Sequence, residues 1–298
     1  MALQYRAEFD ATVTFPDGGG LQAQRFRLDV PHGDVTEAEI VTLFLASLGL
    51  RAVDRVEVAG VRIFADPHVV VGSVTYPVRW VELSHVISAG MVTYPGLPGP
   101  EITPHLTRTA SRANYAEGTE FAIDRLSMVG NTGTYLDSPF HRYAEGADLA
   151  GLRLDVLADL DAVVVRMAGS GVRAVDVGAL AAVEVTGKAV LLHTGGDRDW
   201  GTPAYAQDAP YLTGAGARWL AEHGALLVGI DAVNIDDTQD AARPAHSVLL
   251  AAGIPVVEHL TGLDLLPPTG ARFTAAPPRV VSFGTFPVRA YAALPVDI

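Results

Sequence analysis

One short segment of the chain, from Val129 to His141, concentrates residue types that can do chemistry. It contains two glycines and a proline, which tight turns need, but also Asp137 and His141, which they do not. Far downstream, His246 and Glu258 stand twelve residues apart. Asp, Glu and His together typically hold a hard or borderline divalent ion, and an imidazole can also move protons during catalysis.

Each of these four residues also has an ordinary structural interpretation. Asp137 precedes Ser-Pro and can form a turn through its own side chain, while His141 can cap the loop. His246 stands at an expected helix start and Glu258 at an expected strand end, where solvent can satisfy either of them. Residue types alone therefore leave the catalytic and the structural interpretations open.

The segment resembles the signature of the cyclase family of metal-dependent hydrolases, which includes bacterial kynurenine formamidase. The family pattern reads His-Thr-Gly-Thr-His-x-Asp-x-Pro-x-His, and this chain reads Asn-Thr-Gly-Thr-Tyr-Leu-Asp-Ser-Pro-Phe-His. Asn131 and Tyr135 thus stand where the family has two metal-ligand histidines. The resemblance runs from about residue 80 to 294, and its further segments are Trp80–His85, Tyr94–Gly96, Leu192–Tyr205, Val228–Asp231, His246–Leu250 and Ile254–Leu263.

The resemblance implies two metal positions that share Asp137. Asn131 and Tyr135 would complete the first, but a neutral amide is a poor ligand and a phenol with a pKa near 10 seldom ionises to become one. His246 and Glu258 would complete the second, and both are retained. We therefore expect either one divalent ion, zinc or manganese, on Asp137, His246 and Glu258, or no metal at all.

The same resemblance implies hydrolysis of an amide, lactam or lactone bond in a small molecule. His141 would be the general acid and base beside Asp137, and Tyr135 could donate a hydrogen bond to the oxyanion. The aromatic and polar residues expected to bind the substrate are Asn131, Phe140, Trp200 and Arg198, the arginine for a substrate carboxylate.

Two other functions remain open because two ligand histidines are replaced. The first is a metal-independent lyase, isomerase or ring-forming cyclase that uses Tyr135, Asp137 and His141 as acid and base. The second is a catalytically inactive binding protein, against which the retention of the downstream ligands argues.

The composition of the chain restricts its expected binding partners and its expected location in the cell. The net charge of −13 argues against a nucleic-acid partner, because phosphate binding needs a basic surface. No apolar stretch reaches the roughly 18–20 residues of a membrane span, and the N-terminus lacks the features of a signal peptide. With no cysteine in the chain, we expect a cytoplasmic protein. The resemblance implies a homo-oligomer.

The elements that must position these residues alternate between strands and helices. This alternation predicts an α/β domain over residues 77–298 with a mixed β-sheet and flanking helices. The family resemblance implies that the domain has the swivelling fold of the formamidases. Expected strands are 121–129, 160–167, 189–193, 226–231, 254–258, 279–283 and 288–293, and expected helices are 175–183, 213–224 and 246–252. Residues 129–141 are expected to form a loop. Residues 1–76 predict a small ββαββ-like unit, with strands at 3–15, 22–30, 55–64 and 69–74 and a helix after a capping box at Thr36.

Overall fold

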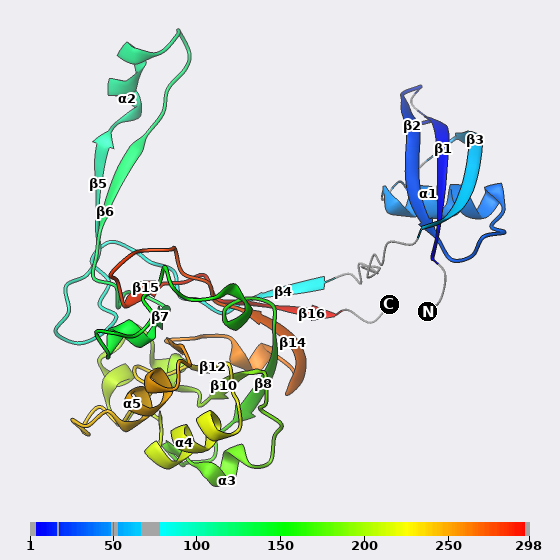
Figure 1. The fold of residues 1–298 in the computed structure, drawn as a ribbon. Coiled ribbons are helices and arrows are strands. Elements are labelled where there is room, and N and C mark those ends of the chain that lie inside the picture. The colour runs from blue at the N-terminus through cyan, green and yellow to red at the C-terminus, as the bar shows by residue number, and fades with distance from the viewer. Residues whose placement is uncertain (1–3, 17, 49, 51–52, 67–77, 296–298) are drawn as a thin grey trace. The chain divides into compact units, whose positions relative to one another are not determined.

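The structure, a computed structural model, describes residues 4–16, 18–48, 50, 53–66 and 78–295. The chain divides into two compact units, Met1–Val74 and Thr75–Ile298 (Figure 1).

The N-terminal unit is a three-stranded antiparallel sheet with one helix packed on it. The strands are β1 (Gln4–Thr14), β2 (Gly20–Val30) and β3 (Arg55–Asp66), in the order β2-β1-β3, and the helix is α1 (Glu37–Ser47). The predicted capping box at Thr36 is confirmed, because Thr36 and Glu39 hydrogen-bond reciprocally. Edge-on contacts of Phe44 with Phe9 and Phe26 join helix to sheet. The strand predicted at 69–74 lies outside the described residues.

The second unit is built on a mixed sheet, as predicted, and this sheet has nine strands. The order is β15-β7-β13-β12-β10-β8-β14-β16-β4, in which only the neighbours among β8, β10, β12 and β13 are parallel. Its strands are β4 (Val78–Glu82), β7 (Tyr135–Asp137), β8 (Leu160–Arg166), β10 (Ala189–His193), β12 (Leu227–Ile230), β13 (Val256–Glu258), β14 (Thr269–Thr274), β15 (Thr285–Pro287) and β16 (Tyr291–Pro295).

Both faces of this sheet are buried, which explains the continuous apolar runs of its parallel strands. Along β8, Val163 and Val165 pack into one core and Ala162 and Val164 into the other. The first of these cores also holds buried side chains of α3 (Val177–Leu180), α4 (Gly214–Glu222) and α5 (Pro244–Ala251), so the helices cover that face. The unit's 3₁₀ helices are η1 (Arg112–Asn114), η2 (Pro139–His141), η3 (Leu154–Val156), η4 (Gly196–Asp199), η5 (Pro203–Ala206) and η6 (Leu263–Leu265).

A two-stranded ribbon projects from the second unit (Figure 1). It consists of β5 (Glu101–Leu106) and β6 (Ile123–Ser127), with the short helix α2 (Arg108–Ser111) between them. The sequence predicted a strand here but not its partner β5. A second small pair joins β9 (Ala174–Val175) to β11 (Tyr211–Leu212).

Two predictions near the site were wrong. Residues 129–141 are not entirely a loop, because Tyr135–Asp137 form strand β7 between β13 and β15. The strand predicted at 279–283 is absent, since Val281 is exposed and Ser282 has a left-handed backbone with φ of 55°. The strand starts instead at Thr285.

Within the described residues, no helix is both long and apolar enough to cross a membrane.

Gly130 sets how closely the segment before β7 approaches β15. A Cβ atom at this position would overlap the carbonyl oxygen of Thr285, so an alanine must push the two segments apart. We expect Gly130→Ala to destabilise the second unit by about 1–3 kcal/mol. Unfolding in urea, followed by tryptophan fluorescence, measures it, because all three tryptophans lie in this unit.

Gly178 in α3 provides the matched control, because a Cβ atom there meets nothing within 4 Å. Gly178→Ala should leave stability unchanged or raise it by about 0.5–1 kcal/mol. Equal stabilities of the two variants would contradict the close approach at Gly130.

Candidate active site

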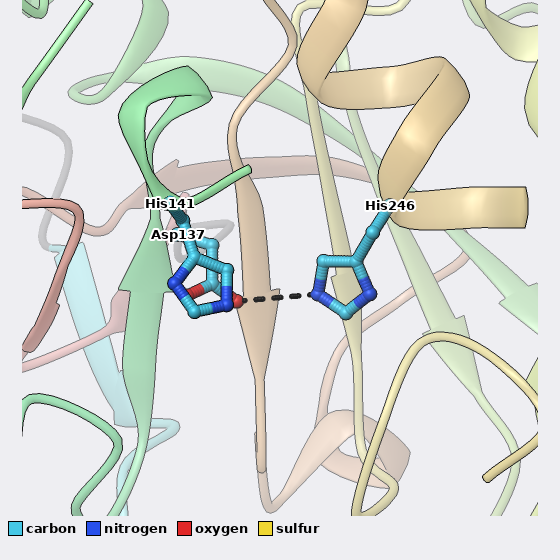
Figure 2. A group of neighbouring side chains, drawn as sticks. All are labelled: Asp137, His141 and His246. Carbon is cyan, nitrogen blue, oxygen red and sulfur yellow. Dashed lines mark hydrogen bonds and ion pairs between the residues drawn. The ribbon is translucent and has the colours of Figure 1, made fainter. Parts of the chain in front are cut away.

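Strand pairing brings the residues of the predicted site together. In the antiparallel pairs around β7, Asp137 faces Thr285 of β15, and Tyr135 faces Glu258 of β13. Because side chains alternate along a strand, Tyr135 and Asp137 point to one face of the sheet while Leu136 fills the core on the other. Helix α5 covers the first face and delivers His246 from its first turn, so that Asp137, His141 and His246 converge (Figure 2).

His246 lies among three carboxylates. Its Nδ1 is 2.7 Å from Asp236 Oδ2, and its Nε2 is 3.4 Å from Asp137 Oδ2 and 3.5 Å from Glu258 Oε1. Burial by itself lowers the pKa of His246, but these carboxylates outweigh it and raise the pKa to about 10. One ring nitrogen is therefore held by Asp236, and the other faces the remaining two acids.

A threonine links His141 to Asp137. The Thr285 hydroxyl donates its single proton to Asp137 Oδ1 at 2.5 Å and lies 2.8 Å from His141 Nδ1. Because the hydroxyl has no second proton, His141 Nδ1 must donate the hydrogen in its contact with Thr285. The tautomer assigned from this network therefore leaves Nε2 as the basic nitrogen. The side chain of His141 is 38% exposed, so a substrate can reach it.

The buried acids have no guanidinium or ammonium partner among the described residues. Asp137, Asp236 and Glu258 form ion pairs only with His141 and His246. Burial opposes ionisation of Asp137, yet the hydrogen bond with His246 and the charges of both histidines hold its pKa below the usual range. Burial raises the pKa of Glu258 to about 7, against the attraction of His246.

This donor set fits a divalent cation. Ligand atoms of Asp137, His141 and His246 all lie within 4.8 Å of one another. The contact of His246 with Asp236 reproduces the arrangement in which a carboxylate orients a metal-ligating imidazole through its other nitrogen. Glu258, the third predicted ligand, borders the same space through Oε1. The predicted roles of these residues stay predictions.

Tyr135 takes part in a directed chain of hydrogen bonds. Its buried hydroxyl donates to Glu258 Oε2 at 2.6 Å and lies 3.2 Å from His259 Nε2. That nitrogen must then donate, so His259 Nδ1 accepts from Tyr205 at 2.8 Å. Burial lowers the pKa of His259 to about 3, and burial beside carboxylates raises the pKa of Tyr135 well above its usual value. Both rings are therefore neutral at physiological pH.

The predicted substrate-binding residues occupy different surroundings. Asn131 is half-buried, and its side chain slightly offsets the rise in the pKa of Tyr135. Trp200 stacks on His85 and meets His259 edge-on. Phe140 is half-buried and Arg198 is exposed. Phe140 and Arg198 do not line the 310 Å³ cavity into which His141 and His246 open. Its walls are His141, Arg142, Asn234, Ala241, Ala242, Arg243 and His246.

Sequence reasoning did not identify Asp236, Thr285 or His259 as site residues. Asp236 lies in a polar loop, ten residues before His246, with no pattern that separates it from the neighbouring Asp237. Thr285 reaches Asp137 only through strand pairing across 148 residues. His259 directly follows a predicted ligand, which is the one signal that could have indicated it.

Comparisons with known proteins identify the family of this chain. The model of the Cyclase family matches residues 81–237. Kynurenine formamidase of Geobacillus thermodenitrificans is 29% identical over 212 residues, which is 71% of this chain and 95% of that protein. The same enzyme of Erythrobacter litoralis is 26% identical over 207 residues, covering 68% of this chain and 90% of that protein.

Solved structures share the fold. Isatin hydrolase A of Labrenzia aggregata, bound to benzyl benzoate, superimposes with a TM-score of 0.64 at 21% identity, over 76% of this chain and 98% of that one. A protein described as a potential metal-dependent hydrolase with cyclase activity gives a TM-score of 0.60 at 23% identity, over 74% and 100%.

Asp236 allows a test of the candidate metal site that spares the expected ligands. Asp236→Asn keeps an acceptor for His246 Nδ1 but removes the negative charge, so we expect metal affinity to fall about 10- to 100-fold. Calorimetric titration of chelator-treated protein with zinc or manganese measures it.

Asp176→Asn is the matched control, because Asp176 also accepts a hydrogen bond from a backbone N–H at the start of a helix, α3, but contacts none of the site residues. It should leave the affinity unchanged. If Asp236→Asn behaved like this control, the orienting role of Asp236 would be refuted.

Proposed function

Because the chain belongs to the Cyclase family, we propose that it is a hydrolase that cleaves a carbon–nitrogen bond in a small amide or lactam. The names of its relatives, kynurenine formamidase and isatin hydrolase, describe enzymes that hydrolyse such bonds. The observation that carries the proposal is the network Asp236–His246–Asp137–Thr285–His141, which joins buried acids to an accessible imidazole.

In this proposal Asp137, His246 and Glu258 would hold one divalent ion, which would supply a Lewis acid for the substrate carbonyl. Asp236 keeps the Nε2 of His246 turned toward that position. Tyr135 would not be a ligand, because its hydroxyl donates to Glu258 and its raised pKa keeps the phenol protonated. The chain would therefore use one ion.

His141 would be the general acid and base. Its Nε2 takes a proton from the attacking water and returns it to the leaving nitrogen, while Nδ1–H remains bonded to Thr285. The carboxylate of Asp137, 3.8 Å from Nδ1, stabilises the positive charge that His141 acquires.

A metal-independent lyase or cyclase is the second candidate. The hydrogen-bond series Tyr205–His259–Tyr135–Glu258 supports it. Every donor in this series already has an acceptor in the protein, so the series does not require a metal ion. Turnover that survives complete chelation would favour this candidate over hydrolysis assisted by an ion.

His141→Gln separates the two roles that this histidine can have. If His141 is the acid and base, kcat for an N-formyl arylamine or an aromatic lactam should fall about 10²- to 10⁴-fold, with the metal content unchanged. Steady-state kinetics and elemental analysis of the same preparation measure both quantities.

His193→Gln is the control, because His193 is buried in the same unit and contacts Arg166 instead of the site. A His141→Gln protein that turns over normally, or one that loses its metal, would contradict the assignment.

A further inference from the structure

Two arginines stand on the wall of the cavity into which His141 and His246 open. Arg142 directly follows His141, and Arg243 precedes α5, which carries His246. We propose that these two guanidinium groups bind a carboxylate of the substrate, so that the substrate class is small amides bearing an anionic group. The inference rests on the proposed function, because it names the substrate of the same site.

Arg243 is held in place by its own backbone. It adopts a left-handed conformation, with φ of 46° and ψ of 59°, which is uncommon for a residue with a side chain. Its N–H donates to the carbonyl of Asp240, and its guanidinium donates through one nitrogen to the carbonyl of Asp237. These hydrogen bonds hold the backbone of Arg243 in place and use one of the five N–H donors of its guanidinium.

Asp237, whose main chain contacts the Arg243 guanidinium, does not neutralise it with its carboxylate. The carboxylate of Asp237 accepts from the Gln239 N–H and lies 4.0 Å from Arg173. Only the Asp237 main-chain carbonyl meets Arg243. No other described residue accepts a hydrogen bond from this guanidinium, so its remaining donors are available to a ligand in the cavity.

Arg142 is connected to Arg243 through Ser247. Arg142 Nε donates weakly to the Ser247 hydroxyl at 3.4 Å, and the Ser247 N–H donates to the carbonyl of Arg243 at 2.9 Å. Among the described residues, neither arginine forms an ion pair with a carboxylate, whereas Arg173 and Arg272 each contact two.

The charges around the cavity favour a role for Arg142 and Arg243 in binding an anion. The chain carries a net charge of −13, and three buried carboxylates surround His246, which lines the cavity. An anionic substrate is therefore repelled unless local cations bind it. Planar guanidinium groups match a carboxylate by paired hydrogen bonds. The volume of about 310 Å³ suits a small molecule. An anion held on this wall leaves the rest of the substrate beside His141.

The test compares one charged and one neutral substrate, N-formylanthranilate and formanilide. In Arg142→Gln and in Arg243→Gln, kcat/KM for N-formylanthranilate should fall roughly tenfold to a hundredfold, mainly through KM. For formanilide it should change by less than about twofold, since no charged hydrogen bond is lost.

Arg79→Gln is the matched control, because Arg79 is also an arginine that donates to a main-chain carbonyl, but on β4. An equal effect on both substrates would overturn the inference while leaving the hydrolase intact.

A binding measurement keeps the test independent of turnover. Purified protein should bind benzoate about tenfold more tightly than benzamide, and Arg142→Gln should abolish that preference. Arg243→Lys keeps the positive charge but loses the paired N–H donors of the guanidinium, so it should retain part of the preference for benzoate. If neither amide is hydrolysed, the proposed function fails, but a benzoate preference that depends on Arg142 still supports the anion site. Absence of that preference, or its persistence in Arg142→Gln, refutes the anion site.

Discussion

The burial of three carboxylates around a single imidazole is the constraint on which the site depends. Asp137, Asp236 and Glu258 are almost completely removed from solvent, and the described residues place no lysine or arginine against them. Unpaired buried charge is costly, so the fold must compensate by hydrogen bonds or by a cation. Backbone N–H groups of Ile235 and Ala245, each donating to one of these acids, supply part of that compensation. The remaining negative charge makes the space at His246 attractive to a divalent ion.

The fold could be predicted from the sequence where burial imposes a pattern. The apolar runs of β8, β10 and β12 have partners on both faces, so their character follows from their sequence. The short strand β7 has no such run. Its three residues, Tyr135 to Asp137, alternate between the site and the core and sit in a segment rich in glycine. Only pairing with β13 and β15, which are distant in the chain, makes a strand of a segment that looks like a loop.

The site could be predicted only in part, for the same physical reason. Asp137, His141, His246 and Glu258 carry chemistry that is recognisable by type and by family pattern, and the fold brings them together. The residues that orient them are ordinary in type. Thr285 acts through one hydroxyl proton, and its effect depends on the strand register that sets it opposite Asp137. Such partners are defined by tertiary geometry and leave no local pattern.

The direction of the hydrogen bonds decides which side of Glu258 can receive an ion. Tyr205 donates to His259, His259 donates to Tyr135, and Tyr135 donates to Glu258 Oε2. This direction requires Glu258 Oε2 to accept, and the attraction of His246 favours the ionised carboxylate, although burial raises the pKa of Glu258 to about 7. The Oε2 edge is therefore occupied by the phenol, whereas Oε1 faces His246 and, across it, Asp137. The edge of Glu258 that would be available to the proposed single ion is therefore Oε1, on the side of His246 Nε2.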